Sequence, residues 1–452
     1  MKYYFPENFQ WGFANASIMT EGAAFEDGRT ASCWDVFSKL PGTIRGGGSM
    51  DVTCDHYHRY EEDFAKMERL GITDYRFSFS WSRILPEGTG RINPEGIAFY
   101  HNMIRSMKRH GIRPLANLCH WDIPWCLQVK GGFGNRDMIQ WFGDYMDVLL
   151  DNFGDEIDTW CTFNEPIGIF VGYAKGVKAP GIRDEQYGRQ ALHNALVCHG
   201  EAVRRFRAHQ LPNAKIGIIV DVWKHYPARP GNPEDIAIAD YYNECDGYGM
   251  ILSPLLLGQY DEKYLAYLKT HDLHLEIGAE DMELIHAPLD YFGLNYYNAF
   301  FEHAEEILAR EELRKKGHPQ HMKMVHHPEM ITEVLFMLQQ KYRLTLPIII
   351  SESGIPQLDP DQGPMEEFLN DDWRIDYLEQ ILAGVYQGLA AGLDIRGYYI
   401  WTFMDNFEWE AGFTMRYGLY YTNYETLERI PKKSAFWYHD VIRDNGFERK
   451  DG

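Results

Sequence analysis

Residues 113–119 read Arg-Pro-Leu-Ala-Asn-Leu-Cys, residues 159–165 read Thr-Trp-Cys-Thr-Phe-Asn-Glu, and together they decide the fold class. Residues 113–119 and residues 159–163 are short and largely apolar, as buried strands are. Between them, residues 138–153 have the spacing of apolar side chains that is typical of an amphipathic helix. A strand, a helix and a second strand in this order predict a parallel βαβ unit.

The same alternation recurs along the whole chain. Six further apolar segments have the length of strands, and they lie at residues 10–16, 73–80, 215–221, 291–295, 347–351 and 395–401. Other helix-patterned segments lie at residues 57–70, 96–110, 187–208 and 373–391. Eight such strands favour an α/β fold with a closed (β/α)8 TIM barrel over an open sheet. The sequence contains no low-complexity tract or Pro/Ser-rich linker, so we expect residues 1–452 to form one domain.

The charge balance argues against several partners. The chain has 44 basic and 66 acidic residues, a formal net charge of −22. Nucleic-acid phosphates and anionic membrane surfaces are therefore not expected as partners. There is no apolar run long enough for a signal peptide or a membrane span, and the seven cysteines lack CxxC spacing. We expect reduced thiols and a cytoplasmic location. The sequence leaves open whether the protein forms a homo-oligomer.

Chemically active side chains follow the predicted strands at the points where these strands end. In a (β/α)8 barrel the active site lies at the carboxyl ends of the strands. Six of the eight expected strands end on or next to such groups, which are Arg76, His120 with Trp121, Asn164 with Glu165, Asn295 with Tyr297, Glu352, and Trp401. Solubility alone does not explain this pattern, so we expect these residues to meet at one site.

Two of these groups, Glu165 and Glu352, form a pair of carboxyl groups, which is the least that cleavage of a glycosidic bond requires. Apolar packing around Glu165 would raise its pKa and keep it protonated as a general acid. Glu352 would have to be ionised to attack the anomeric carbon, and Arg76 and Tyr297 are candidates to stabilise that charge. A separation of about 5 Å between the carboxyl groups predicts retention, and roughly 6.5–9.5 Å predicts inversion.

Two further stretches bear on ligands. Residues 399–409 place Trp401 and Trp409 on either side of acidic side chains that include Glu408, a composition suited to the apolar face and the hydroxyls of a sugar. Residues 302–327 are polar and contain, among other residues, His318, His321, His326 and His327. Their spacing matches no metal-ligand motif, so we interpret this stretch as a surface excursion over the barrel mouth and expect no metal or cofactor.

Several motifs resemble those of glycoside hydrolase family 1, the β-glucosidase family. They are Asp55-His56-Tyr57-His58-Arg59-Tyr60, Tyr75-Arg76-Phe77-Ser78-Phe79-Ser80-Trp81, His120-Trp121-Asp122-Ile123-Pro124, Thr162-Phe163-Asn164-Glu165-Pro166, Asn295-Tyr296-Tyr297, the stretch 401–409 and Pro431-Lys432-Lys433-Ser434. The resemblance covers essentially the whole chain. It implies a (β/α)8 barrel, retention of configuration and no cofactor.

The resemblance also implies roles for individual residues. Glu165 matches the acid/base and Glu352 the nucleophile of the family. The groups that orient the nucleophile and the sugar 2-hydroxyl are matched by Arg76, Asn164, Asn295 and Tyr297. The sugar-binding shell is matched by His120, Trp121, Trp401, Glu408 and Trp409.

The chain departs from the family pattern at several positions. Met19 stands where the family has a glutamine that holds the sugar 3- and 4-hydroxyls, and Ser353 replaces the asparagine after the nucleophile. No tryptophan lies between Trp223 and Trp373, so the usual tryptophan of the +1 subsite is replaced, for example by Met324. Glu408 takes the place of the serine of phosphosugar-binding members, which predicts a non-phosphorylated substrate.

The leading hypothesis is therefore a retaining β-glycosidase that acts on a small glycoside or oligosaccharide. Met19 favours altered recognition of the sugar 3- and 4-positions, and the alternative is that a nearby polar residue replaces the missing glutamine. Two other interpretations stay open: a carbohydrate-binding protein that has lost catalysis, and a transglycosylase that uses the same residues.

Overall fold

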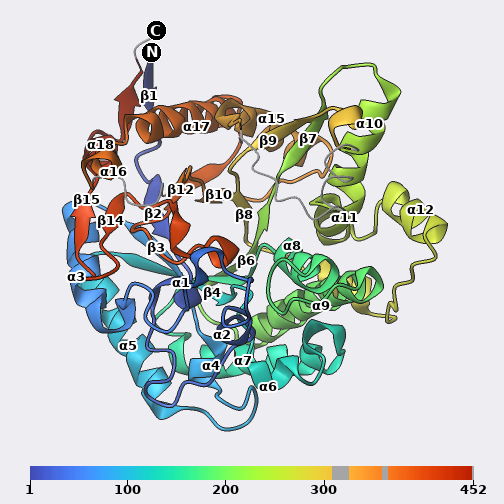
Figure 1. The fold of residues 1–452 in the computed structure, drawn as a ribbon, viewed down its shortest axis with the longest axis horizontal. Helices are drawn as coiled ribbons and strands as arrows, with labels where there is room; N and C mark the ends of the chain where they lie inside the picture. The colour runs from blue at the N-terminus through green and yellow to red at the C-terminus, as the bar shows by residue number, and fades with distance from the viewer. Residues whose placement is uncertain (308–324, 359–364, 450–452) are drawn as a thin grey trace.

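The computed structural model describes residues 1–307, 325–358 and 365–449, and its centre is a closed barrel of eight parallel strands (Figure 1). In chain order, these strands are β2 (Gln10–Ala14), β3 (Asp74–Ser78), β4 (Arg113–Cys119), β5 (Thr159–Asn164), β6 (Lys215–Asp221), β8 (Tyr291–Asn295), β10 (Ile348–Glu352) and β12 (Ile395–Trp401). All eight predicted strands are confirmed. The barrel closes where β12 pairs with β2, with Trp401 opposite Ala14.

The five predicted helices are also present, and they surround the barrel. They are α3 (His56–Arg69), α5 (Pro94–Arg109), α7 (Asp137–Phe153), α9 (Glu185–His209) and α17 (Asp372–Ala390). Local sequence sets their ends: Pro94 is the first residue of α5, and the side chain of Asp184 accepts a hydrogen bond from the Tyr187 N–H at the start of α9. Each helix packs apolar side chains against the strands, as amphipathic helices do.

Shorter elements connect and cap this core. The additional helices are α1 (Ser17–Thr20), α2 (Cys33–Phe37), α4 (Trp81–Ile84), α6 (Trp125–Gln128), α8 (Ile167–Phe170), α10 (Pro233–Asp240), α11 (Gly249–Leu257), α12 (Glu262–Thr270), α13 (Asp281–Ile285), α15 (Ile331–Gln340), α16 (Met365–Leu369) and α18 (Lys433–Asp444). Outside the barrel, strand pairs are formed by β1 (Lys2–Tyr4) with β16 (Gly446–Glu448), β7 (Lys224–Pro227) with β9 (Ala299–Glu302), β11 (Gln357–Leu358) with β13 (Met415–Arg416), and β14 (Tyr420–Thr422) with β15 (Arg429–Pro431). The β1–β16 pair brings the two ends of the chain side by side (Figure 1).

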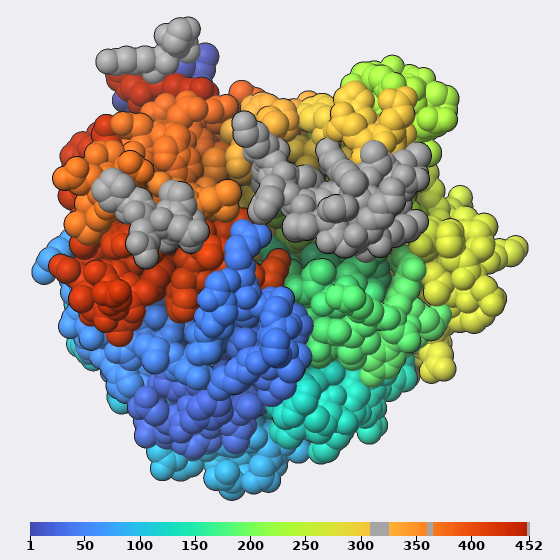
Figure 2. Space-filling view, in the orientation of Figure 1, coloured from blue at the N-terminus to red at the C-terminus, as the bar shows by residue number. Residues whose placement is uncertain are grey.

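Strand register determines which side chains meet at the barrel mouth. Asn295 lies opposite Asp221 of β6 on one side and opposite Glu352 of β10 on the other. Because all strands run in the same direction, their last residues form one ring at one end of the barrel. Figure 2 shows early (blue), middle (green) and late (red) segments of the chain meeting on one face.

The structure also bears on the predictions about membrane spans, cysteines and the polar stretch 302–327. In the part of the chain that the structure describes, no helix is both long and apolar enough to cross a bilayer. All seven cysteines lie in that part and are free thiols. His318, His321 and Met324 lie outside the described residues.

Candidate active site

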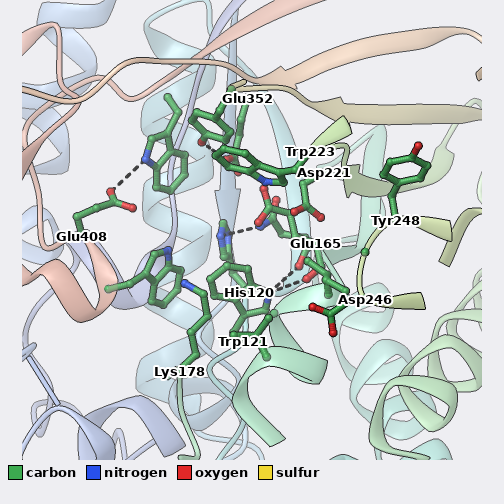
Figure 3. Close-up of a pocket in the computed structure, with 18 of the residues that line it drawn as sticks. His120, Trp121, Glu165, Lys178, Asp221, Trp223, Asp246, Tyr248, Glu352 and Glu408 are labelled. Carbon is green, nitrogen blue, oxygen red and sulfur yellow. Dashed lines mark hydrogen bonds between the residues drawn. The ribbon is translucent and has the colours of Figure 1, made fainter. Parts of the chain in front are cut away.

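A pocket of about 430 Å³ opens at the carboxyl ends of the strands, and most of the predicted site residues line it. These lining residues are His120, Trp121, Asn164, Glu165, Tyr297, Glu352, Trp401, Glu408 and Trp409. Arg76 and Asn295 are fully buried and contact the lining carboxylates from behind. Figure 3 shows Glu408 at one end of the pocket, Tyr248 and Asp246 at the other, and both glutamates between these ends.

Glu352, the last residue of β10, is held by two hydrogen-bond donors. Nη2 of Arg76 donates to its Oε1 in a buried ion pair, and the Tyr297 hydroxyl donates to its Oε2 over 2.5 Å. Burial and the neighbouring charge of Glu352 raise the pKa of Tyr297 well above its usual value, so Tyr297 remains a donor. The two donors stabilise the negative charge that a nucleophilic carboxylate needs.

Asn164 and Asn295 connect the two glutamates. The Asn164 Oδ1 accepts hydrogen bonds from Arg76 Nη1 and from Asn295 Nδ2, both at 3.0 Å. Asn295 Nδ2 also donates to Glu165 Oε1 over 2.7 Å. The predicted catalytic residues therefore form one hydrogen-bonded network, in which side chains from four strands fix the orientation of both carboxyl groups.

Glu165 lies in the opposite electrostatic environment from Glu352. Burial raises its pKa well above the usual value, and the neighbouring negative charges of Asp221 and Glu352 raise it further. A raised pKa favours the protonated form of the carboxyl group, which is the form that a general acid requires. Asp221, the last residue of β6, is itself buried, and its pKa is raised to about 7.

Substitution of Asp221 by asparagine should move the basic limb of the pH–rate profile to lower pH. A general acid works while it is protonated, so activity falls as the pH rises through its pKa. Removal of the adjacent negative charge lowers the pKa of Glu165, and we expect a shift of roughly 0.5–1 pH unit in kcat/KM. Asp246→Asn is the control because Asp246 lines the far end of the pocket and is paired with Lys175. An unchanged limb in Asp221→Asn would contradict this electrostatic role.

His120 is a neutral hydrogen-bonding group in the pocket. Burial and the charges of Arg76 and Lys178 lower its pKa well below the usual value. The Asn164 side-chain amide donates to Nε2 over 2.9 Å, which places the ring proton on Nδ1. That atom is buried and has no hydrogen-bond partner among the described residues. Nδ1–H is therefore a buried donor without a partner among the described residues.

Trp121 contributes its ring, but not its N–H, to the pocket. Its Nε1 donates to the backbone carbonyls of Asn164 and Glu165 at 3.0 and 2.8 Å. This position requires Gly168, because a Cβ atom there would lie 2.2 Å from the indole ring. The ring packs against Trp409 with centroids 4.6 Å apart. Trp121 therefore offers an apolar surface to a ligand.

Trp401 and Glu408 meet at the end of the pocket that residues 399–409 were expected to build. Nε1 of Trp401 donates to Glu408 Oε2 over 3.2 Å, and burial raises the pKa of Glu408 to about 8. With a pKa of about 8, this carboxyl group repels a phosphate group at neutral pH less than a fully ionised carboxylate would.

Met19, a predicted binding residue, does not lie on the pocket wall. It is fully buried in α1, and its backbone carbonyl accepts a hydrogen bond from the Phe407 N–H over 3.5 Å. Met19 thus lies beneath the segment that carries Glu408. Lys178, which the sequence analysis overlooked, does line the pocket, with its ammonium group 4.6 Å from the Trp121 ring and 5.6 Å from the Trp409 ring.

Three residues of the site have left-handed backbone conformations. The φ angles are +71° at Trp121, +46° at Glu165 and +46° at Trp409. For residues with side chains, this conformation costs of order 1–3 kcal/mol each, and it concentrates at functional sites. The surrounding packing therefore holds these three side chains in place against a local conformational preference.

Sequence reasoning also missed Asp221 and Trp223, which line the pocket next to Glu165 (Figure 3). A signal for Asp221 was present, since it is the last residue of a predicted strand. Trp223 follows it by two residues. The remaining wall residues come from α8 and the turn after it, from β7 and β9, from the segment between α10 and α11, and from Tyr417, and no strand-end rule identifies those.

A closed parallel barrel has at its mouth one glutamate that is paired with a buried arginine, one buried glutamate whose pKa is raised, and tryptophan rings beside both. These features define the class of protein: it is a glycoside hydrolase. Within that class, the chain belongs to glycosyl hydrolase family 1, whose sequence model matches residues 1–447.

Individual relatives agree with this assignment. The chain is 39% identical to beta-glucosidase A of Acetivibrio thermocellus, over 99% of this chain and all of the relative, and 37% identical to beta-glucosidase A of Thermotoga maritima, over 98% and 99%. The solved structure of a Thermotoga maritima beta-glucosidase in complex with glucoimidazole superposes with a TM-score of 0.89 at 36% identity, covering 98% of this chain and all of that one.

Proposed function

We propose that this protein is a retaining β-glycosidase that hydrolyses a non-phosphorylated β-glycoside through a covalent glycosyl-enzyme. The observation that carries the proposal is the contrast between its two carboxyl groups. Arg76 and Tyr297 donate hydrogen bonds to Glu352, whereas burial and nearby carboxylates raise the pKa of Glu165. Two titratable groups whose environments differ in this way are suited to act as nucleophile and acid.

The steps follow from these states. Glu165 donates its proton to the glycosidic oxygen while the Glu352 carboxylate attacks the anomeric carbon, so the C–O bond to the leaving group breaks and a glycosyl ester forms on Glu352. Glu165, now ionised, removes a proton from a water molecule that attacks the same carbon. The ester bond breaks, the sugar leaves with its original configuration, and both carboxyl groups return to their starting states.

A 2-deoxy-2-fluoro-β-glucosyl fluoride tests this pathway because the fluorine slows release of the covalent intermediate. We expect one glycosyl mass on the peptide that contains Glu352, and proton NMR of normal turnover should show the β-anomer first. Binding without labelling would support the carbohydrate-binding alternative. Glycosyl transfer to added sugars in preference to water would support the transglycosylase.

The proposed substrate is β-glucoside-like, as the names of the relatives indicate, with altered recognition of the sugar 3- and 4-positions. Met19 supports altered recognition, because its thioether cannot form the hydrogen bonds of the glutamine amide that the family has at this position. In addition, its side chain is not on the pocket wall. Lys178 supplies a donor at the same end of the pocket. Its one described ion-pair partner, Glu410, is 3.3 Å away, and an ammonium group has three protons to donate.

A panel of nitrophenyl glycosides of glucose, galactose, fucose, mannose, xylose and glucuronic acid, with 3- and 4-modified glucosides added, tests the sugar preference. Met19→Gln should raise kcat/KM for unmodified glucosides relative to the modified ones. If the parent already turns over unmodified glucosides and galactosides as well as the modified sugars, the altered recognition is wrong.

Lys178→Met should lower kcat/KM for the best sugar of this panel by about 10-fold or more, since hydrogen bonds to charged groups contribute about 1.5–3 kcal/mol. Methionine retains the length of the side chain over the tryptophan rings and removes the charge. Lys224→Met is the matched control, because Lys224 is half-buried over Tyr226 and does not line the pocket. An equal loss in both variants would show that Lys178 does not contact the sugar.

A further inference from the structure

Tyr377, a tyrosine of α17, contacts the catalytic network from outside the pocket. It is 3% exposed and does not line the pocket. Its hydroxyl donates a hydrogen bond to the backbone carbonyl of Tyr297 over 2.8 Å. Tyr297 in turn donates to Glu352. Tyr377 is therefore separated by a single residue from the carboxylate that attacks in the proposed reaction.

The backbone of Tyr297 depends on hydrogen bonds from outside its own strands. Tyr297 lies in residues 296–298, the link between β8 and β9. A carbonyl within a strand accepts from the neighbouring strand, whereas the carbonyl of Tyr297 accepts from the side chain of Tyr377. One residue earlier, the Tyr296 N–H donates to the Glu352 carbonyl over 3.0 Å. These two bonds fix the backbone on both sides of the Tyr297 Cα atom, and thereby the direction of its side chain.

The turn behind the nucleophile approaches the same hydroxyl group. Burial raises the pKa of Tyr377, and the Ser353 side chain and the Gly354 backbone oppose this rise. Ser353 and Gly354 directly follow Glu352 in the chain. The Tyr377 hydroxyl therefore lies between the turn that carries the nucleophile and the backbone of the residue that donates to it.

Arg374, one turn earlier on the same face of α17, holds the helix against the barrel mouth. It is buried, and its Nε donates to Asp371 over 2.8 Å in an ion pair. Its guanidinium group also donates to the backbone carbonyls of Ile355 and Tyr417. Ile355 lies three residues after the nucleophile, and the Tyr417 ring meets the Tyr297 ring edge-on at 6.0 Å. The start of α17 is therefore fixed relative to both parts of the site.

We propose that Tyr377 is a positioning residue for the nucleophile. It holds the backbone of Tyr297 so that the Tyr297 hydroxyl points at Glu352 and keeps the carboxylate aligned with the anomeric carbon. Misplacement of a catalytic group by about 1 Å can cost roughly 10²-fold in rate, even when the change lies away from the substrate. This inference rests on the proposed glycosidase function, which assigns Glu352 as the nucleophile.

The rate of covalent labelling tests this role. 2-Deoxy-2-fluoro-β-glucosyl fluoride reacts at Glu352: its anomeric C–F bond breaks, fluoride leaves, and the glycosyl ester forms. We expect Tyr377→Phe to slow labelling at saturating reagent about fivefold or more, as expected for loss of one hydrogen bond. The affinity for methyl 1-thio-β-glucoside, measured by calorimetry on the full chain, should change by less than about twofold, because Tyr377 does not line the pocket.

A double-mutant cycle separates positioning from a general contribution to the fold. Tyr297→Phe removes the hydroxyl that contacts the nucleophile, so Tyr377 has no donor to direct in that variant. Adding Tyr377→Phe to Tyr297→Phe should therefore change the labelling rate by less than about twofold. Tyr386→Phe is the matched control, because Tyr386 belongs to the same helix and its ring packs edge-on against Tyr3 and Phe5. It should leave the labelling rate unchanged.

Two results would overturn the proposal. One is a labelling rate that Tyr377→Phe does not change. The other is an equal fold-loss from Tyr377→Phe in the parent and in Tyr297→Phe, which would show that Tyr377 supports the fold without acting through the Tyr297 hydroxyl. Failure of the glycosidase function has a different signature: the parent chain itself then stays unlabelled at Glu352, and the inference falls with that function.

Discussion

Glu352→Ala should lose activity by a factor on the order of 10⁴ or more in kcat. The variant lacks the carboxylate that attacks the anomeric carbon, and removal of an enzyme nucleophile costs this much where it has been measured. The sugar-binding residues at the Glu408 end of the pocket are unchanged, so binding of the methyl thioglucoside should persist. Steady-state rates with an activated aryl glucoside and calorimetry measure the two effects.

The same variant tests the stereochemistry. Sodium azide fits the space that the carboxylate leaves and should restore turnover with formation of the α-glycosyl azide, because attack then comes from the face that Glu352 occupied. A β-glycosyl azide would contradict the assignment of Glu352. Removal of one partner of a buried ion pair destabilises proteins by about 3–5 kcal/mol, and both Glu352→Ala and Glu352→Gln remove the charge that pairs with Arg76. Glu352→Gln is the control for shape, because its side-chain carbonyl can still accept a hydrogen bond from Arg76.

Glu165→Ala should reduce kcat/KM by about 10²–10⁴-fold for glycosides with poor leaving groups, the range typical of lost general acid catalysis. A dinitrophenyl glucoside departs without protonation, so its first step should change far less. The pH profile with the poor leaving group should also lose its basic limb, because that limb reports Glu165.

Azide again separates the possible roles. With Glu165→Ala, azide should speed the second step by attacking the glycosyl-enzyme and should give the β-glycosyl azide. Glu165→Gln is the matched control for shape, since glutamine preserves a side-chain carbonyl that can accept from Asn295. Equal losses for good and poor leaving groups would show that Glu165 positions the substrate and does not transfer the proton.

Most of the framework could be predicted from local patterns. The eight strand-length apolar segments and the helices between them predicted the barrel correctly, with ends that differ by two residues or fewer. The strand-end rule then identified Glu165, Glu352 and their donors. Prediction of this kind succeeds because hydrophobic periodicity is a property of neighbouring residues, and a parallel barrel brings the ends of its strands together whatever the loops do.

By itself, the sequence determined the fold, the two glutamates and the family. The tertiary structure alone decided that Asp221 lies close enough to raise the pKa of Glu165 and that backbone carbonyls accept the Trp121 N–H. It also decided that Lys178 reaches the pocket while Met19 does not, and that Phe300 stacks with Trp223 and His225. The physical reason is that a pKa, a hydrogen-bond partner and a stacked ring all depend on burial and on distances of a few ångströms between residues far apart in the chain. Folding sets those distances, and no local pattern in the sequence contains them.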